Sequence, residues 1–282
     1  MKFLTATERA KQPRSLNILL HGASGSGKTT QAQGLPPESS LLIDFEAGTA
    51  ALADWKGPIL DINKQAQELD CHPWALAQAM ASLCSGPDMA VQPEATYGKA
   101  YYDKVVTMFP AMVEGLKNID TIFLDSLSDA TRTCYSYCEQ QPYAISAKSG
   151  KPDGLAVYGG LGKEMIAFAK RMQHSSKDLV AAVILDKDTD EFQRPIFTPQ
   201  MMGSVTKNTL IGIFDIALTI HNEEDADGLV NRSFITGTPN KWGYPAKDRT
   251  RGLDLVEEFT DGDTDALWRL MVKAKAALKG GK

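Results

Sequence analysis

The segment HGASGSGKTT, residues 21–30, determines the expected fold of this chain. It contains the pattern G-x-x-x-x-G-K-[ST], in which Gly22, Gly27, Lys28 and Thr29 hold the fixed positions, and it follows the apolar run LNILLH. Glycines let consecutive backbone N–H groups turn inward around phosphate oxygens, and the start of a helix adds its dipole. The segment therefore predicts a phosphate-binding loop between a strand and a helix, with Lys28 on the β- and γ-phosphates and the Thr29 hydroxyl on Mg²⁺. We expect ATP to contact every residue of this loop: Gly22, Ala23, Ser24, Gly25, Ser26, Gly27, Lys28, Thr29 and Thr30.

Short apolar runs alternate with helical stretches along the rest of the chain. Near-continuous apolar runs are typical of strands that are buried on both faces of a parallel sheet. Such runs occupy residues 16–21, 41–45, 121–125 and 179–185, and later strands are expected at 214–221 and 232–236. Helices are expected at 28–34, 73–84, 99–117, 127–140, 159–174 and 264–279. The alternation predicts an α/β fold with a doubly wound, mostly parallel sheet flanked by helices.

The length of 282 residues is sufficient for one large core. We expect a leader at 1–15 and the core at 16–282, interrupted by an insertion at about 56–93. The stretch ISAKSGKPDGLAVYGGLG at 145–162 is rich in glycine, lysine and serine, and we expect it to form a mobile loop.

Composition and charge exclude several classes of protein. A 43% apolar and 23% charged composition is typical of a globular protein, and no apolar run is long enough to span a bilayer, so no membrane partner is expected. The four cysteines show no C-x-x-C spacing, and the spacing of Cys134 and Cys138 favours helix packing over a disulfide. We therefore expect a reducing, cytoplasmic environment. The net charge of −5 does not by itself indicate a nucleic-acid-binding protein.

Acidic residues end two of the apolar runs. TIFLDS places Asp125 at a strand end, where it can hold Mg²⁺ together with Thr29, as a Walker B acid does. LLIDFEAG places Asp44 and Glu46 after the neighbouring strand, and a carboxylate there can activate the water that attacks the γ-phosphate. We choose Glu46 for this role and Asp44 as the second candidate.

With these motifs the chain resembles the RecA-type recombinase family. In that family a phosphate-binding loop is followed by a strand ending D-x-E, here Asp44 and Glu46, and by a strand ending Asp-Ser, here Asp125 and Ser126. The chain is most similar to the short phage-type RecA-like ATPases that act as single-strand annealing proteins, and the likeness extends from 16 to 251. The resemblance implies a RecA-like P-loop fold and hydrolysis of ATP at subunit interfaces with Glu46 as catalytic base. It also implies DNA-dependent activity in homologous pairing, in a bacterial host cytoplasm if the chain is phage-encoded.

The resemblance further implies two DNA-binding loops. The first corresponds to about 147–161 and the second to roughly 187–207, and both would supply phosphate contacts and base stacking. The candidate DNA-binding residues are Lys148, Lys151, Tyr158, Lys187, Arg194 and Lys207. In recombinases a glutamine follows the strand that precedes the second loop and senses the γ-phosphate, whereas this chain has Asp186 and Lys187 there.

Two further features are interpreted through the same family. Lys247 and Arg249, in WGYPAKDRTR, match the paired basic residues that reach the ATP of a neighbouring subunit, as an arginine finger does. Phe3 and Ala6, in FLTATE, resemble the F-x-x-A motif by which relatives of RecA polymerise. Phe3 would fill an apolar pocket on the next subunit, and such a head-to-tail contact produces a ring or a filament.

Three functions are compatible with the sequence. The first is an ATP-dependent recombinase or annealing protein that binds single-stranded DNA, with a single-strand-binding protein as a further partner. The second is a P-loop kinase, against which Glu46 argues because a kinase does not activate water. The third is an assembly or motor ATPase that does not act on DNA. Strong stimulation of ATP hydrolysis by single-stranded DNA would support the first function and exclude the kinase.

Overall fold

The computed structural model describes residues 5, 14–224, 227–228 and 230–280. Its strands are β1 (Asn17–Gly22), β2 (Ser40–Asp44), β3 (Ile59–Asp61), β4 (Thr121–Asp125), β5 (Asp178–Thr189), β6 (Pro195–Pro199), β7 (Ile216–Glu224), β8 (Val230–Ile235), β9 (Lys247–Asp248) and β10 (Val256–Thr260). Its helices are η1 (Thr29–Gly34), η2 (Thr49–Leu52), α2 (Ile62–Glu68), α3 (Pro73–Ser85), α4 (Lys99–Met108), α5 (Pro110–Leu116), α6 (Leu127–Glu139), η3 (Pro142–Ala144), α7 (Gly154–Gln173), α8 (Ser204–Ile213) and α9 (Ala266–Gly280).

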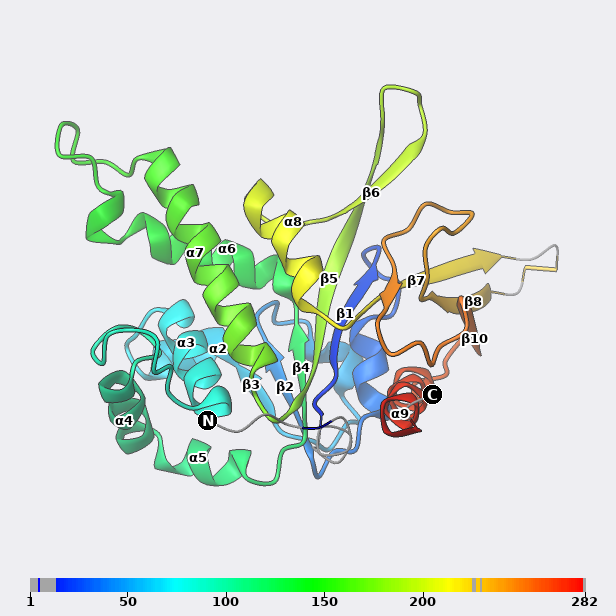
Figure 1. The fold of residues 1–282 in the computed structure, drawn as a ribbon, viewed down its shortest axis with the longest axis horizontal. Helices are drawn as coiled ribbons and strands as arrows, with labels where there is room; N and C mark the ends of the chain where they lie inside the picture. The colour runs from blue at the N-terminus through cyan, green and yellow to red at the C-terminus, as the bar shows by residue number, and fades with distance from the viewer. Residues whose placement is uncertain (1–4, 6–13, 225–226, 229, 281–282) are drawn as a thin grey trace.

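The strands form one mixed sheet in the order β10-β8-β7-β1-β5-β4-β2-β3 (Figure 1). From β7 to β3 the neighbours run parallel, whereas β8 and β10 are antiparallel at one end of the sheet. The register places Gly22 beside Ile184 and Asp44 beside Asp125, so the carboxyl ends of β1, β5, β4 and β2 meet at one edge. The expected α/β fold class, with a mostly parallel sheet flanked by helices, is confirmed.

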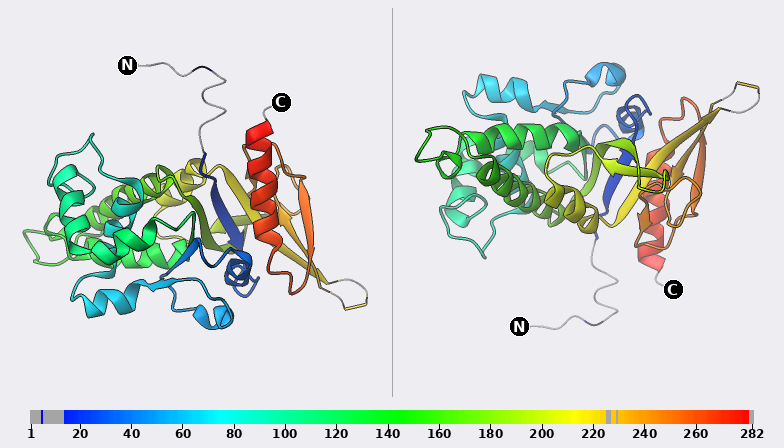
Figure 2. Two further views of the ribbon diagram at one scale, coloured as in Figure 1. Left: turned by 90° about the horizontal axis from the view of Figure 1, so that it is seen from below. Right: turned by 90° about the horizontal axis from the view of Figure 1, so that it is seen from above.

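Each face of the sheet packs against its own hydrophobic cluster. On β1, Leu19 faces the cluster formed with α3, α6, α7 and α8, whereas Ile18 and Leu20 face the cluster formed with η1 and α9. The two views of Figure 2 show the sheet between these two layers. Alternation along a strand sends successive side chains to opposite faces, which is why these runs are apolar at nearly every position.

The segment expected to be an insertion at 56–93 takes part in the main core. It supplies β3, which pairs with β2 as the edge strand, and the helices α2 and α3. Trp74 on α3 is fully buried and its ring lies 5.1 Å from that of Phe168 on α7. These helices therefore form part of the layer that covers one face of the sheet.

Two helices differ from the expectation. The helix after the phosphate loop is a 3-10 helix of six residues, and Pro36 prevents its continuation. The helix expected at 99–117 is divided at Phe109, because Pro110 has no N–H for the α-helical ladder and begins a new helix, α5.

The mobile loop expected at 145–162 is wrong beyond Asp153, because α7 begins at Gly154. The Asp153 carboxylate caps this helix by accepting hydrogen bonds from the N–H groups of Leu155 and Ala156 at 2.9 and 3.2 Å. A side chain at Gly160 would place its Cβ 2.2 Å from the Tyr143 hydroxyl. At least this glycine therefore serves close packing and not flexibility.

No helix within the described residues is long and apolar enough to cross a membrane. The four cysteines are free thiols, and Cys134 and Cys138 are buried in the core. Phe3 and Ala6, the predicted oligomerisation residues, lie outside the described residues.

Candidate functional site

The phosphate loop connects β1 to η1 at the carboxyl edge of the sheet. Gly25 and Gly27 have φ angles of 74° and 90°, a region that only glycine adopts without strain. The ammonium group of Lys28 donates hydrogen bonds to the carbonyl oxygens of Gly22 and Ala23 at 3.0 and 2.8 Å. Burial lowers the pKa of Lys28. The loop thus encloses a cation at the place where the sequence predicts phosphate oxygens.

Thr29 and Asp125 meet across the sheet. The Thr29 hydroxyl donates a hydrogen bond to one carboxylate oxygen of Asp125 at 2.6 Å, while the other oxygen, Oδ1, is buried and has no hydrogen-bond partner among the described residues. Burial raises the pKa of Asp125 to about 6. A hydroxyl beside an unsatisfied carboxylate oxygen fits the oxygen ligands that Mg²⁺ prefers. The two residues can therefore hold the metal ion that neutralises the phosphates of a bound nucleotide.

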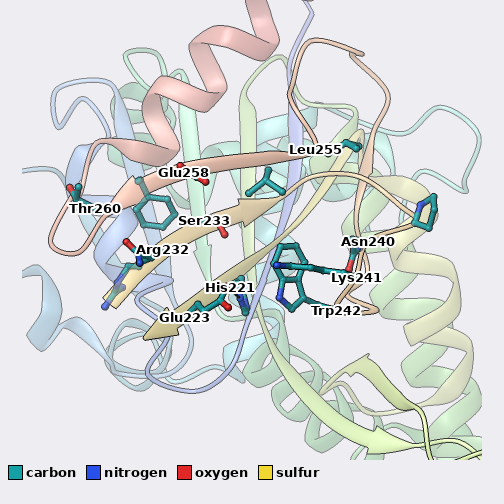
Figure 3. A pocket seen from close by; sticks show the side chains of 14 residues that line it. His221, Glu223, Arg232, Ser233, Asn240, Lys241, Trp242, Leu255, Glu258 and Thr260 are labelled. Atoms are coloured by element: carbon teal, nitrogen blue, oxygen red, sulfur yellow. Dashed lines mark hydrogen bonds and ion pairs between the residues drawn. The ribbon is translucent and has the colours of Figure 1, made fainter. Parts of the chain in front are cut away.

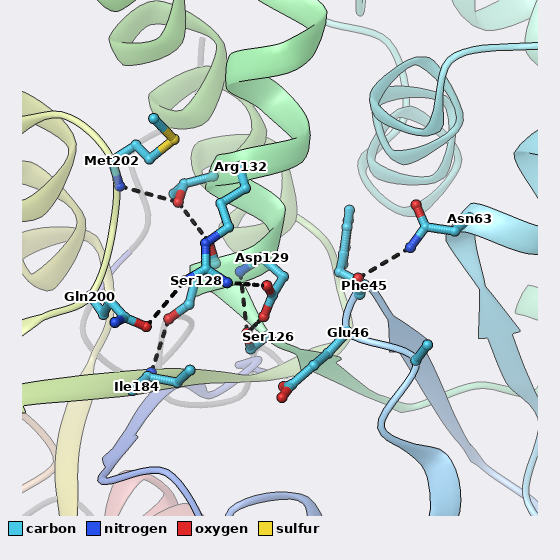
Figure 4. Close-up of polar contacts among 12 residues, drawn as sticks. Phe45, Glu46, Asn63, Ser126, Ser128, Asp129, Arg132, Ile184, Gln200 and Met202 are labelled. Atoms are coloured by element: carbon cyan, nitrogen blue, oxygen red, sulfur yellow. Dashed lines mark hydrogen bonds and ion pairs between the residues drawn. The ribbon is translucent and has the colours of Figure 1, made fainter.

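Asp44 and Glu46 have different environments. Asp44 is 2% exposed, and its Oδ1 accepts hydrogen bonds from the N–H groups of Glu46 and Ala47 at 2.8 and 2.9 Å. Asp44 therefore holds the turn after β2. Glu46 is exposed, and in Figure 4 its side chain extends from this turn toward the end of β4 and makes none of the drawn contacts. The second oxygen of Asp44, Oδ2, is buried without a hydrogen-bond partner among the described residues, whereas the Glu46 carboxylate is exposed. The accessibility of Glu46 to an attacking water favours it as the first candidate.

Helix α6 starts directly after Asp125 and carries a polar network that the sequence did not reveal. Ser126 caps the helix and donates its hydroxyl proton to Asp129 at 2.7 Å. Arg132 donates to Asp129 at 2.6 Å and to the side-chain carbonyl of Gln200 at 3.3 Å (Figure 4). The Gln200 N–H is bonded to the carbonyl of Ile184 on β5. Gln200 thus lies beside β5, although in the sequence it follows β6 and not β5.

The second expected DNA loop is a β-hairpin. β5 continues to Thr189 and pairs with β6, so that the hairpin projects beyond the carboxyl edge of the sheet (Figure 1). Lys187 lies on β5, Arg194 is ion-paired with Asp190 at 2.6 Å, and the backbone of Lys207 lies in α8. Four acidic residues accompany the two basic ones between 186 and 194, so the hairpin is not a basic surface. Phe192 at its tip is 69% exposed.

Two of the three candidate residues in the first expected DNA loop lie in a loop, and the third lies on a helix. Lys148 and Lys151 are exposed in the segment between η3 and α7, which lies at the same edge of the molecule as the hairpin (Figure 1). Tyr158 instead lies on α7, where its ring is 5.2 Å from that of Tyr135, and it is 47% exposed.

Lys247 and Arg249 are engaged within their own chain. Both side chains point the same way and donate hydrogen bonds to carbonyl oxygens at the end of α8, Lys247 to Ile211 at 2.6 Å and Arg249 to Gly212 at 2.8 Å. Cations at a helix C-terminus satisfy its free carbonyl groups and its dipole. β9 pairs with the start of β7, so both residues lie at the amino edge of the sheet, opposite their own phosphate loop.

A hollow of about 900 Å³ lies along β7, β8 and β10 (Figure 3). Trp242 lies at one end, its ring 4.6 Å from that of His221 and 4.5 Å from the ammonium group of Lys241. At the other end lies Arg232, which reaches the phosphate loop. The sequence offered no signal for Arg232, because it is separated from the loop by about two hundred positions.

The structure therefore gathers the phosphate loop, Thr29, Asp125 and Glu46 at one edge of the sheet, and the segment between η3 and α7 lies further out on the same side (Figure 1). It does not bring Lys247 and Arg249 to this edge.

The family model of the AAA domain AAA_24 matches residues 14–250, and the chain belongs to this family. Membership implies that the loop binds a nucleotide, typically with Mg²⁺. No curated protein matches the chain.

Among solved structures, the chain is similar to a KaiC-like protein from the hyperthermophilic archaeon Pyrococcus horikoshii OT3, with 10% identity, 90% of this chain and 88% of that chain covered, and a TM-score of 0.40. It is also similar to the flagellar accessory protein FlaH from Methanocaldococcus jannaschii, with 10% identity, 88% and 86% covered, and a TM-score of 0.38.

Proposed function

We propose that this protein is an ATP-dependent recombinase or annealing protein that binds single-stranded DNA. It hydrolyses ATP at subunit interfaces, with Glu46 as the general base and Mg²⁺ held by Thr29 and Asp125. The observation that carries the proposal is the bonding of helix α6 to both stems of the β5–β6 hairpin. A kinase has no use for a free carboxylate at position 46, which would activate water.

Three hydrogen bonds make this connection. The Ile184 N–H, on β5, donates to the Ser128 hydroxyl at 3.0 Å, and the Met202 N–H, after β6, donates to the Thr131 hydroxyl at 3.2 Å. The third is the bond from Arg132 to Gln200. Since α6 begins at the strand end that carries Asp125, a shift caused by nucleotide and metal reaches the hairpin through this helix. Coupling of this kind is what a DNA-dependent ATPase requires.

The two surfaces proposed for DNA differ in chemistry. Lys148 and Lys151 oppose only Asp153 in their segment and supply the phosphate contacts. The hairpin carries an excess of acidic side chains, so its contribution is the exposed ring of Phe192, which can stack on a base.

Single-stranded DNA is expected to accelerate ATP hydrolysis by the full chain, measured as phosphate release with and without an unstructured oligonucleotide. An unchanged rate, together with an unchanged oligomeric size in electron micrographs, would leave an ATPase that does not act on DNA.

Replacing both Lys148 and Lys151 with alanine should weaken binding of single-stranded DNA, measured as the binding constant at several salt concentrations. Each lost phosphate contact makes the negative slope of log K against log salt about 0.7 less steep, so the double variant should flatten it by about 1.4. The matched control is Lys99→Ala with Lys104→Ala, which removes the same charge from exposed positions on α4. If both double variants bind DNA alike, this segment is not part of the DNA site.

We also propose that the leader joins subunits through Phe3 and Ala6, and that Arg249, whose side chain is 51% exposed, is better able than Lys247 to reach the ATP of a neighbour. Phe3→Glu is expected to give a folded monomer that still binds nucleotide, because a carboxylate cannot enter an apolar pocket. Light scattering with ATP and DNA measures this, and Thr5→Glu adds the same charge to the leader as a control. Normal assembly of the Phe3 variant would assign the contact to other residues.

A further inference from the structure

Arg232 occupies an unexpected position beside the phosphate loop. It lies in the middle of the antiparallel end of the sheet, paired with Asn222 on β7 and with Phe259 on β10. Its side chain points to the same face as Phe234, which is the face that carries η1 and α9. There its Nη1 donates a hydrogen bond to the carbonyl oxygen of Ser26, inside the loop, at 3.2 Å.

The guanidinium group is fixed by a second contact. Its Nη2 lies 2.7 Å from the carboxylate of Asp261, in the turn between β10 and α9. Its Nε is buried and has no hydrogen-bond partner among the described residues, so Ser26 and Asp261 supply the polar contacts described for the group. The side chain is only 20% exposed, and the contact with Ser26 is therefore shielded from water.

Gly27 is adapted to this arrangement. A Cβ there would lie 2.6 Å from Nη1 of Arg232, so glycine both permits the φ of 90° and leaves room for the arginine in its present position. The peptide bond between Ser26 and Gly27 is trans, and in a trans peptide the C=O and N–H groups point in opposite directions. No described residue accepts a hydrogen bond from the Gly27 N–H.

From this geometry we infer that Arg232 is a positioning residue for nucleotide binding. Arg232 holds the Ser26 carbonyl on the outside of the loop. The Gly27 N–H, on the other side of the same peptide, therefore points away from Arg232 and toward the phosphate oxygens. A charged donor on the carbonyl also polarises the peptide and strengthens the N–H as a donor. Arg232 itself does not touch the phosphates. The inference rests on the nucleotide-binding part of the proposed function.

The test measures the affinity of Mg·ADP by titration calorimetry, so that no turnover is required. Arg232→Ala is expected to bind Mg·ADP about tenfold more weakly, because the Ser26–Gly27 peptide loses its anchor. Arg232→Lys keeps a donor for Ser26 and should restore the affinity to within about threefold. The matched control, Arg269→Ala, removes an arginine that is paired with Asp263 near the same turn and that makes no hydrogen bond to the phosphate loop among the described residues. It should bind as the parent protein does.

A second readout distinguishes positioning from a general loss of structure. In protein labelled with 15N-glycine, the amide signal of Gly27 should move in Arg232→Ala and stay in Arg269→Ala. The inference is overturned if Arg232→Ala binds Mg·ADP within twofold of the parent protein, or if Arg232→Lys is as weak as alanine while melting at the parent temperature. If the parent protein itself fails to bind Mg·ADP, it is the proposed nucleotide site that fails, and this inference with it.

Discussion

Replacing Glu46 with glutamine is expected to reduce ATP turnover by about a thousandfold while nucleotide binding remains close to normal. Glutamine preserves the shape of the side chain but cannot take a proton from water. The Glu46 side chain is exposed and makes none of the contacts drawn in Figure 4, and its N–H bond to Asp44 is kept by glutamine, so the substitution should not disturb the turn after β2. The measurement is phosphate release under single-turnover conditions, compared with the affinity for Mg·ATP.

Asp44 provides the control for this prediction. Asp44→Asn removes the other carboxylate of the D-x-E motif, but it also weakens the hydrogen bonds from Glu46 and Ala47, so a loss of thermal stability should accompany any loss of rate. If Glu46→Gln turns over ATP at the parent rate, the general base is another group, and Asp44 is then the next candidate.

Lys28→Ala is expected to lower kcat/KM for ATP by about a hundredfold or more, because it removes the buried cation of the phosphate loop. Lys28 is 8% exposed and now donates to two loop carbonyls, so bound phosphate would replace these partners. The loss should appear in nucleotide affinity as well as in turnover.

The matched control for Lys28 is Lys187→Ala, which removes a lysine from the β5–β6 hairpin. It should leave basal hydrolysis unchanged without DNA. Retention of full activity by Lys28→Ala would mean that the loop does not hold the phosphates, whatever its sequence.

The sequence predicted the parts of the site whose signal is local. The loop at 22–30 is a continuous motif, and Asp125 and Asp44 end apolar runs. In a parallel sheet such strand ends meet at one edge, so their proximity could be inferred without coordinates.

Local composition failed where packing decides the conformation. The glycines of 154–162 suggested a loop, but at Gly160 the absence of a side chain lets Tyr143 approach α7. The spacing of Lys247 and Arg249 correctly indicated that both side chains point the same way, but not that α8 ends beneath them.

The phosphate loop, the acidic strand ends and the α/β class could thus be predicted from the sequence, because each depends on neighbours along the chain. The tertiary structure alone decided the position of Gln200 beside β5 and the contact of Arg232 with Ser26. Both depend on strand pairing between distant segments: the return of β6 along β5, and the register of β8 between β7 and β10. No local pattern encodes these contacts, because they arise only when the sheet has formed.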